Sequence, residues 1–426
     1  MMEGIYNIKE YREDTVPCRE GRDWTDAFRR AAKDADAAGG GMLYVPAGRY
    51  PTRSIQLYSN TTLYLNAGAE LYYLDDKENY EIVQGEFEGI ASDVYMPCIF
   101  ADCAHHVAVK GDGIINGNGL AWWNAVRTGT LALPRPYLIG FQYCEHVRIE
   151  GVTLLNAPAW TVHPLYCRDV EVIGVSIKNP YDSPNTDGIN PDGCSNVRIL
   201  NCQIDVGDDC ITLKSGTEKT PRLRPCENIT IANCTMIHGH GGIVIGSEMS
   251  GGIRNVTVSN CVFQNTDRGI RVKTRRRRGG IVENLHLSNL IMDRVMCPFV
   301  FNMYYNCGAD GQEKYVWDKE AYPVDEGTPA IREVHISNVT VTGATAAAGF
   351  LYGLKEQPVR NVTLTDVSIT MDPDGKPGLP AMMSQLKPMS GAGFFVRNAQ
   401  EAVFRNVRIR NVRGAEIDGD NISITS

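Results

Sequence analysis

Two aspartates, Asp208 and Asp209, stand side by side in the chain, and further residues of catalytic type lie on either side of them. Asp187 precedes the pair, and His240 and Arg271 follow it. Carboxyl groups and imidazoles are the side chains that most often donate and accept protons in enzymes. These residues could therefore carry out acid–base chemistry if the fold brings them together.

The adjacent acids conflict with the local structure that the sequence predicts. The segments around them alternate apolar and polar residues as β-strands do, and successive side chains of a strand point to opposite faces. One acid of a regular strand would then face the core, where an unpaired carboxylate is costly or becomes neutral. Because Gly207 precedes the pair, the backbone can bend there. We expect Asp208 and Asp209 to lean toward the same surface.

A repeat supplies the elements that must position these residues. Each unit alternates apolar and polar residues, turns at Asn or Gly and alternates again, which indicates strand–turn–strand. The units mostly recur every 23 to 32 residues, a period typical of stacked structural units. The spacing of leucine-rich repeats and the four strands of a propeller blade are missing, so the sequence predicts a parallel β-helix. The first apolar positions of the units are 147, 170, 197, 229, 256, 285, 334, 362 and 407.

The ends and the long steps depart from the repeat. Residues 24–38 carry apolar residues at helical spacing and stop at Gly39–Gly41, which predicts a helix that caps the N-terminal end of the solenoid. We expect a single β-helix domain over residues 1–426, with a cap at about 1–50. Loop insertions that wall a binding face are expected near 80–96, 120–140, 303–330 and 373–392.

The coil register predicts that the polar residues meet. Asp187, Asp208, Asp209, His240 and Arg271 fall at similar distances from the first apolar residue of their coils. Strands of neighbouring coils lie about 4.8 Å apart, so these groups can form one cluster.

Composition narrows the setting. The chain has 426 residues, a hydrophobic fraction of 43% and a net charge of −8, which argues against general nucleic-acid binding. No apolar run approaches the roughly 18 residues of a membrane span, and the N-terminus lacks the features of a secretory signal. We expect a cytoplasmic protein, or a secreted one if a signal has been removed.

The thirteen cysteines are odd in number and contain no CxxC pair, which indicates reduced thiols rather than disulfides or a zinc site. Three of them, Cys202, Cys234 and Cys261, occupy the same position in consecutive coils. We expect them to stack inside the solenoid.

Four short motifs carry a resemblance to a known family. They follow one another on consecutive coils as Asn185-Thr186-Asp187, Gly207-Asp208-Asp209, Gly239-His240-Gly241 and Arg271-Val272-Lys273. Together they resemble glycoside hydrolase family 28, the polygalacturonases and their relatives, over about residues 20–415. The resemblance implies a right-handed parallel β-helix that needs no cofactor or metal. It also implies hydrolysis of α-1,4 galacturonosidic bonds with inversion of the anomeric centre.

The resemblance assigns a role to each residue of the cluster. Asp208 would be the general acid, Asp187 and Asp209 would be the bases that orient water, and His240 would help to set the protonation of the acid. Crowded carboxylates titrate at separated pKa values, which suits one acid and one base near neutral pH.

The same resemblance implies the residues that bind the substrate. Arg271 and Lys273 would bind a carboxylate of the sugar, and a planar guanidinium is suited to that task. Asn185 and Tyr305 would also contact the substrate.

The predicted partner is a pectic oligosaccharide or another uronide-containing glycan, with no nucleic acid and no membrane. The segments Gly239–Gly252 and Arg271–Gly280 resemble bacterial exo-polygalacturonases, which implies release of sugars from a chain end. We expect the run Arg275–Arg278 to favour an anionic sugar, while Trp122–Trp123 could stack on sugar rings or pack under a loop. Three alternatives stay open: another pectic glycan such as rhamnogalacturonan, a non-catalytic glycan-binding β-helix, and a calcium-dependent lyase.

Overall fold

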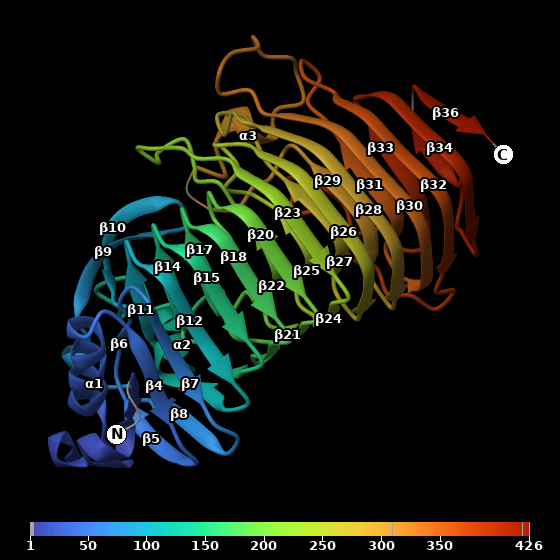
Figure 1. Cartoon of the computed structure of the whole chain (residues 1–426). Helices are drawn as coiled ribbons and strands as arrows, with labels where there is room; N and C mark the ends of the chain where they lie inside the picture. The colour runs from blue at the N-terminus through green and yellow to red at the C-terminus, as the bar shows by residue number, and fades with distance from the viewer. Residues whose placement is uncertain (1–3, 309, 420, 426) are drawn as a thin grey trace. The chain divides into compact units, whose positions relative to one another are not determined.

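The computed structural model describes residues 4–308, 310–419 and 421–425. The chain divides into two compact units, Met1–Asp208 and Asp209–Ser426. Each unit consists of parallel strands stacked coil upon coil (Figure 1). The expected single domain over residues 1–426 stays a prediction. Among the helices in the described ranges, none combines the length and the apolar character that crossing a membrane requires.

Three rows of parallel strands build the N-terminal unit. Each strand pairs with the strand at the same point of the next coil. The first row consists of β1 (Ile5–Asn7), β4 (Gly41–Val45), β7 (Thr61–Leu65), β12 (His105–Gly111), β15 (Glu145–Glu150), β18 (Arg168–Ile173) and β20 (Ser195–Leu200). The second row consists of β5 (Gly48–Thr52), β8 (Ala69–Tyr73), β13 (Ile114–Asn116), β16 (Thr153–Leu155), β19 (Ser176–Lys178) and β21 (Gln203–Val206). The third row consists of β6 (Ile55–Gln56), β11 (Ile99–Asp102), β14 (Ile139–Gln142) and β17 (Val162–Leu165).

The predicted capping helix is α1 (Thr25–Ala37), which packs against β4 and β6. Its buried face contains Phe28 and four alanines, as the spacing predicts, and Gly39–Gly41 follow it with positive φ angles. The other small elements of this unit are η1 (Ile8–Asp14), β2 (Val16–Cys18), β3 (Gly21–Asp23), η2 (Lys77–Asn79), the hairpin β9 (Ile82–Phe87) and β10 (Ile90–Tyr95), and α2 (Leu120–Arg127).

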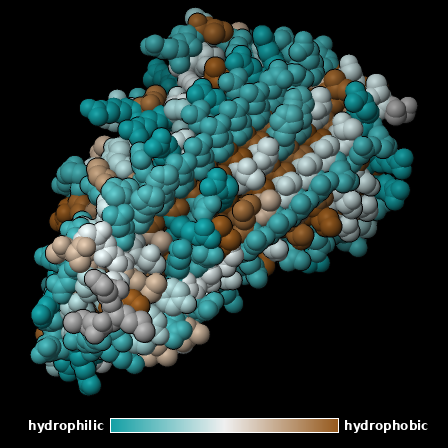
Figure 2. Space-filling view, in the orientation of Figure 1, coloured by the Kyte–Doolittle hydropathy of each residue, from teal (hydrophilic) through white to brown (hydrophobic). Residues whose placement is uncertain are grey.

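In the C-terminal unit the first two rows merge into long strands. Figure 2 shows the result on one face, where side chains of like hydropathy form rows that alternate between hydrophilic and hydrophobic. The long row consists of β23 (Cys226–Ala232), β24 (Thr235–His238), β26 (Ile253–Gln264), β28 (Ile281–Asp293), β30 (Ala330–Ala344), β32 (Val359–Met371), β34 (Ala399–Arg410) and β36 (Ile422–Thr425). The other row consists of β22 (Asp209–Leu213), β25 (Gly241–Ile245), β27 (Arg268–Lys273), β29 (Cys297–Asn302), β31 (Ala347–Tyr352), β33 (Ala392–Arg397) and β35 (Ile417–Gly419), and α3 (Lys314–Trp317) lies in a loop.

The predicted repeat register holds within each unit, with one exception. Val147 pairs with Val170 and Val170 with Val197 in the N-terminal unit. In the last repeat, however, Val407 pairs with Val367, and Ala402 is the residue that pairs with Val362. The predicted register is wrong in this repeat because β34 contains two stretches of alternating apolar residues. The second stretch, around Val407, resembles the start of a repeat more closely than the first stretch, around Ala402.

Asparagines recur in the repeat because they suit its turns and because they bind one another. Asn255 and Asn284 adopt positive φ angles of 56° and 55°, which asparagine tolerates better than most residues. The Nδ2 group of Asn255 donates to Oδ1 of Asn228 at 3.0 Å, and that of Asn284 donates to Oδ1 of Asn255 at 3.2 Å. These hydrogen bonds satisfy polar groups on three successive coils and help to hold those coils in register.

All thirteen cysteines are free thiols. Cys234 and Cys261 lie on adjacent coils of the C-terminal unit and are buried, as the stacking prediction requires of them. The hydrogen bond with the Cys234 side chain, together with burial, raises the pKa of the Cys261 thiol. Cys202, in the N-terminal unit, is also buried. These cysteines act as small apolar residues of the core.

Gly242 on β25 provides a test of coil packing. A Cβ atom at this position would overlap the ring of Phe263, which is fully buried in β26. We expect Gly242→Ala to lower the free energy of unfolding by about 1–3 kcal/mol, because the packed core has no room for the methyl group. Denaturant unfolding measures the loss, and Phe263→Leu in the same chain should recover part of it. Equal stability of Gly242→Ala and wild type would contradict this packing.

Candidate active site

Asp187 and Asp208 lie together in the N-terminal unit. One carboxylate oxygen of each residue lies within 4.8 Å of the other. Asp187 is buried, whereas Asp208 is half-buried in a bend. Gly207 makes this bend possible, because a Cβ there would lie 2.6 Å from the carbonyl oxygens of Pro180 and Ser183. The predicted break in strand alternation therefore occurs directly before the pair of acids.

Two residues that the sequence did not single out support Asp187. Asn190 is fully buried and donates its Nδ2–H to Oδ2 of Asp187 at 2.9 Å. The carbonyl oxygen of Asn190 lies 3.0 Å from Nδ1 of the buried His163, which can donate to it. The backbone carbonyl of Asp187 accepts from the N–H of Thr161 at 2.8 Å. Asp187 is therefore fixed in position by both its side chain and its backbone.

Arg135, in the expected insertion at 120–140, holds the turn that carries Asn185. Its guanidinium donates to Oδ1 of Asn185 at 2.8 Å and to the carbonyl oxygens of Pro158 and Pro184 at 2.8 and 2.7 Å. Burial lowers the pKa of Arg135 to about 10, although the nearby carboxylates, among them Asp187, oppose this shift. Asn185 is thus placed beside Asp187 with its side-chain oxygen already engaged, so its remaining donor is the group that could meet a ligand.

Asp209 begins β22 in the C-terminal unit and lies in a different environment from Asp208. Its side chain is 1% exposed and accepts from Nη1 of Arg271 at 2.9 Å and from Nζ of Lys273 at 2.7 Å. Burial alone would raise the pKa of Asp209, but Lys273 and Arg271 outweigh it and hold the pKa well below its usual range. The two cations therefore favour the ionised form of Asp209.

His240 and the glycine after it pack beside Asp209. Gly241 pairs with Asp209 in the parallel ladder of β22 and β25. A Cβ at Gly241 would lie 3.1 Å from Oδ1 of Asp209 and 3.3 Å from Cδ of Arg271, so only glycine leaves this space to the ion pair. His240 is half-buried, and a positive charge on its ring would further lower the pKa of Asp209.

Tyr305 lies over the two cations, as the resemblance implies for a residue of the binding face. Its ring centroid is 5.3 Å from Nζ of Lys273 and 5.9 Å from Cζ of Arg271. Burial raises the pKa of Tyr305 well above its usual value. The expected insertion at 373–392 also contacts Arg271, whose Nη2 donates to Sδ of Met382 at 2.9 Å. Loops 303–330 and 373–392 thus both contact the residues around Asp209.

A second buried ion pair, which the sequence analysis missed, lies near Lys273. Nζ of Lys214 lies 2.9 Å from Oε2 of Glu248, and both side chains are almost completely buried. Burial would raise the pKa of Glu248, but Lys214, Arg278 and Lys273 together lower it to about 2. No spacing rule predicts this pair, because its members come from different coils and each occurs in an otherwise apolar or small-residue segment.

The run Arg275–Arg278 is not a solvated face. Arg275 is 1% exposed and donates to the carbonyl oxygen of Cys307 at 2.9 Å. Arg276 and Arg278 are buried against Glu356 and Glu218, respectively. Among the four, Arg277 alone is exposed. Three of these arginines therefore hold loops together, and only one could meet a sugar directly.

The tryptophans at 122 and 123 pack under neighbouring segments. Trp122 is fully buried and meets the rings of Tyr80 and Tyr95 edge-on, each at 5.2 Å. Trp123 donates its Nε1–H to the carbonyl oxygen of Ala157 at 3.0 Å. Of the two predicted possibilities, packing is the one that the structure shows.

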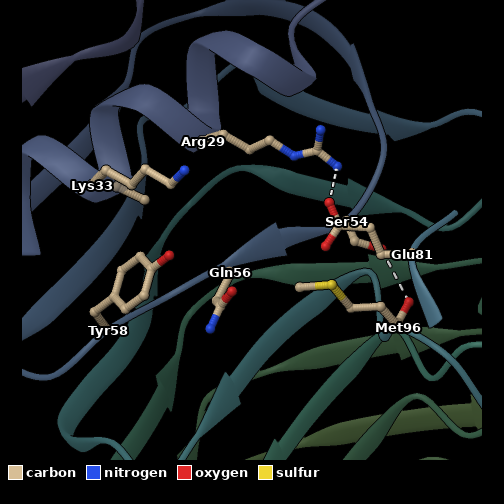
Figure 3. A pocket seen from close by; sticks show the side chains of 8 residues that line it. Arg29, Lys33, Ser54, Gln56, Tyr58, Glu81 and Met96 are labelled. Carbon is tan, nitrogen blue, oxygen red and sulfur yellow. Dashed lines mark hydrogen bonds and ion pairs between the residues drawn. The ribbon is translucent and has the colours of Figure 1, made fainter. Parts of the chain in front are cut away.

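A cavity of about 130 Å³ lies between α1 and the first strand of the third row (Figure 3). Arg29 and Lys33 of α1 line it together with Gln56 and Tyr58, but Arg29 is already paired with Glu81 at 2.5 Å. None of the predicted catalytic residues lines this cavity.

The residues present suit proton transfer at an acetal more than metal binding. Asp187 and Asp208 could offer oxygen ligands to a hard cation, but calcium takes about six to eight such ligands. A half-buried acid beside a fixed carboxylate is instead the arrangement that general acid–base catalysis needs.

Comparisons with known proteins agree with this chemistry. The family description "Glycosyl hydrolases family 28" matches residues 86–378. A probable polygalacturonase of Vitis vinifera is 35% identical over 357 residues, which cover 81% of this chain and 70% of the relative.

Solved structures show the same fold. A hyperthermoactive exopolygalacturonase from Thermotoga maritima is 27% identical and superposes with a TM-score of 0.80, covering 97% of this chain and 93% of its own. A family 28 exopolygalacturonase from Yersinia enterocolitica superposes with a TM-score of 0.81 at 20% identity, covering 99% and 78% of the two chains. The fold is thus the right-handed parallel β-helix that the resemblance implied.

Asn190 should matter through Asp187. We expect Asn190→Ala to lower kcat about tenfold to a hundredfold with little change in KM, because Asp187 loses the hydrogen bond that orients it. Steady-state kinetics measure both constants, and a circular-dichroism melt checks the fold. A variant that folds normally and keeps the wild-type kcat would remove the positioning role.

Glu248→Gln should destabilise the protein in a pH-dependent way. Because the pKa of Glu248 is lowered from its usual value of 4.5 to about 2, the ionised form stabilises the folded state above pH 4.5. That stabilisation is lost as the pH falls from 4.5 toward 2.

We therefore expect a loss of about 3 kcal/mol or more at pH 7, because the buried Lys214 loses the carboxylate that offsets its charge. Denaturant unfolding at a series of pH values measures both effects. The variant should lose less additional stability than wild type as the medium is acidified, and parallel pH curves for the two proteins would contradict the argument.

Proposed function

Because the chain belongs to glycosyl hydrolases family 28 and is a polygalacturonase that hydrolyses pectic galacturonan, we propose that it removes sugars from a chain end by acid–base catalysis at its aspartates. In this proposal Asp208 donates a proton to the leaving oxygen. The half-buried position of Asp208 supports this role, because a proton donor must meet the substrate.

The two other aspartates have different roles in the proposal. Asp209 is a poor proton acceptor, because Lys273 and Arg271 hold its pKa well below the usual range. Asp187 accepts a hydrogen bond from the neutral side chain of Asn190 at 2.9 Å. We therefore assign the base that activates water to Asp187. Asp209 then serves as a fixed anion that accepts a hydrogen bond from water and holds the two cations in place.

Arg271 and Lys273 bind the carboxylate of the sugar in the proposed complex. Each uses one donor on Asp209 at 2.9 and 2.7 Å, and an arginine carries five N–H groups and a lysine three. Tyr305, within 6 Å of both cations, would close this subsite. A galacturonide suits these groups better than a neutral sugar, since its carboxylate can form charge-assisted hydrogen bonds with the donors that do not bind Asp209.

The stereochemical course is inversion in this proposal. Inverting enzymes typically separate their carboxyl groups by about 6.5–9.5 Å to admit a water. The nearest oxygens of Asp187 and Asp208 are within 4.8 Å, so the water would have to lie beside this pair rather than between its nearest oxygens.

Action at a chain end rests on a further comparison. The structure of the exopolygalacturonase from Thermotoga maritima matches 97% of the length of this chain. The loops at 303–330 and 373–392 contact the residues around Asp209 and could close the groove beyond the terminal sugar. A reducing compartment, and hence the cytoplasm, stays our proposal for the location, since free cysteines are typical of such compartments.

The product pattern tests the proposal directly. With galacturonan as substrate, we expect monomers or dimers from the first minutes, and the first-formed anomer should be opposite to the substrate linkage by proton NMR. Asp208→Asn should reduce kcat by about a thousandfold or more while the protein still binds oligogalacturonides, because it removes the proton and keeps the shape. Early mixtures of medium-length oligomers would rule out chain-end action. A retained anomer would make one aspartate a nucleophile instead.

A further inference from the structure

A cavity of about 190 Å³ lies in the C-terminal unit, and neither Asp209 nor the two cations that bind it line this cavity. It has room for roughly a dozen water-sized groups, which is about the size of one hexuronate. Its lining includes Arg276, Arg277, Tyr315, Tyr322, Pro323 and Asp325. Aromatic rings and a proline next to charged groups suit a sugar, which has apolar C–H faces and polar edges.

Arg276 lines this cavity, and all five of its N–H groups donate hydrogen bonds to the surrounding protein. It forms a bidentate ion pair with Glu356 at 2.5 and 3.0 Å and donates to the carbonyl oxygens of Tyr315, Asp318 and Glu320 at 2.8 to 2.9 Å. Its charge is therefore neutralised and its position fixed. Arg276 is therefore a fixed part of the lining but does not offer a free cation to a ligand.

Arg277 differs from its neighbours in every respect that matters for binding. It is exposed, and no carboxylate forms an ion pair with it within the described part of the chain. Its guanidinium lies over the ring of Tyr315, with 4.0 Å between Cζ and the ring centroid. The stack thus holds the side chain at the lining of the cavity, and none of the hydrogen bonds among the described residues uses its guanidinium donors.

The backbone of Arg277 is strained. Its φ angle is +72°, a left-handed conformation that is unfavourable for residues other than glycine. The stack on Tyr315 offsets only part of this cost, because the cation–π contact of an exposed arginine is weak. The arginine therefore adds little or nothing to the stability of the fold, although glycine would fit this backbone without strain.

We propose that this cavity binds one uronate residue of a pectic chain outside the residues that carry out hydrolysis. Arg277 binds the carboxylate of the sugar, and Tyr315 and Tyr322 pack against its ring. The carboxylate of Asp325 accepts a hydrogen bond from a sugar hydroxyl. This inference rests on the proposed galacturonide substrate. Four residues of chain span at most about 14 Å, so Arg277 is close enough to Lys273 for one oligosaccharide to reach both.

The test compares substrates of increasing length. We expect Arg277→Gln to raise KM about tenfold to a hundredfold for long oligogalacturonides, because it removes a charge-assisted pair, and to leave both constants unchanged for the dimer. Arg360→Gln is the matched control, since Arg360 is an exposed arginine of the same unit on β32. It should change neither constant at any length.

Arg277→Gly separates binding from folding. It should lose the same affinity while its Tm stays equal to or above that of wild type, because the backbone strain is relieved. A clear fall in Tm would make Arg277 a structural residue and overturn the inference. So would wild-type constants for Arg277→Gln on every length, and in that case hydrolysis would stand.

If wild type hydrolyses no galacturonide, the proposed function fails and the cavity is tested by calorimetry instead. Wild type and Arg277→Gln are each titrated with galacturonate and with galactose, and the heat of binding shows whether the cavity binds a uronate through Arg277. A galacturonate signal that is lost in Arg277→Gln and absent with galactose supports the site. Equal signals for the two proteins, or no signal in either, refute it.

Discussion

The buried carboxylate of Asp209 is the charge on which the cationic side of the site depends. At 1% exposure it can stay ionised only because Arg271 and Lys273 pair with it, and removal of either partner would leave a buried charge. The ion pair in turn fixes both cations, which lie on one strand with a single residue between them. Gly241 must lack a side chain for the same reason, since a Cβ would enter the space of the pair.

The two adjacent aspartates can do different work because the bend at Gly207 gives them different surroundings. Asp208 lies half-buried in the bend, and Asp209 is the first residue of a buried strand. A group that exchanges protons with a substrate must be reachable, whereas a fixed anion is best kept dry and paired. One peptide bond, which keeps the two Cα atoms about 3.8 Å apart, therefore joins a half-buried acid to a buried, ion-paired carboxylate.

The sequence predicted the residues that recur with the coils and missed those that do not. Asp187, Asp209, His240 and Arg271 could be found because each lies at a similar point of its coil. Asn190 and Glu248 could not, because a hydrogen-bond partner three residues away or an ion-pair partner on another coil leaves no periodic trace. The end of the repeat was misaligned at Val407 for a related reason, since two apolar sets in one strand satisfy the same pattern.

The arginine run shows why charge in a sequence cannot be interpreted without the fold. Alone it suggests a solvated face or a polyanion site, yet Glu218 and Glu356 arrive from distant loops and neutralise Arg278 and Arg276. Stacked strands repeat one geometry and cannot by themselves distinguish one sugar chain from another. Loops must do so, and they need fixed attachment points. The coil that places Arg271 and Lys273 on Asp209 continues directly into the arginines that tie these loops down, so the ion pair around Asp209 and the attachment points of the loops belong to one stretch of chain.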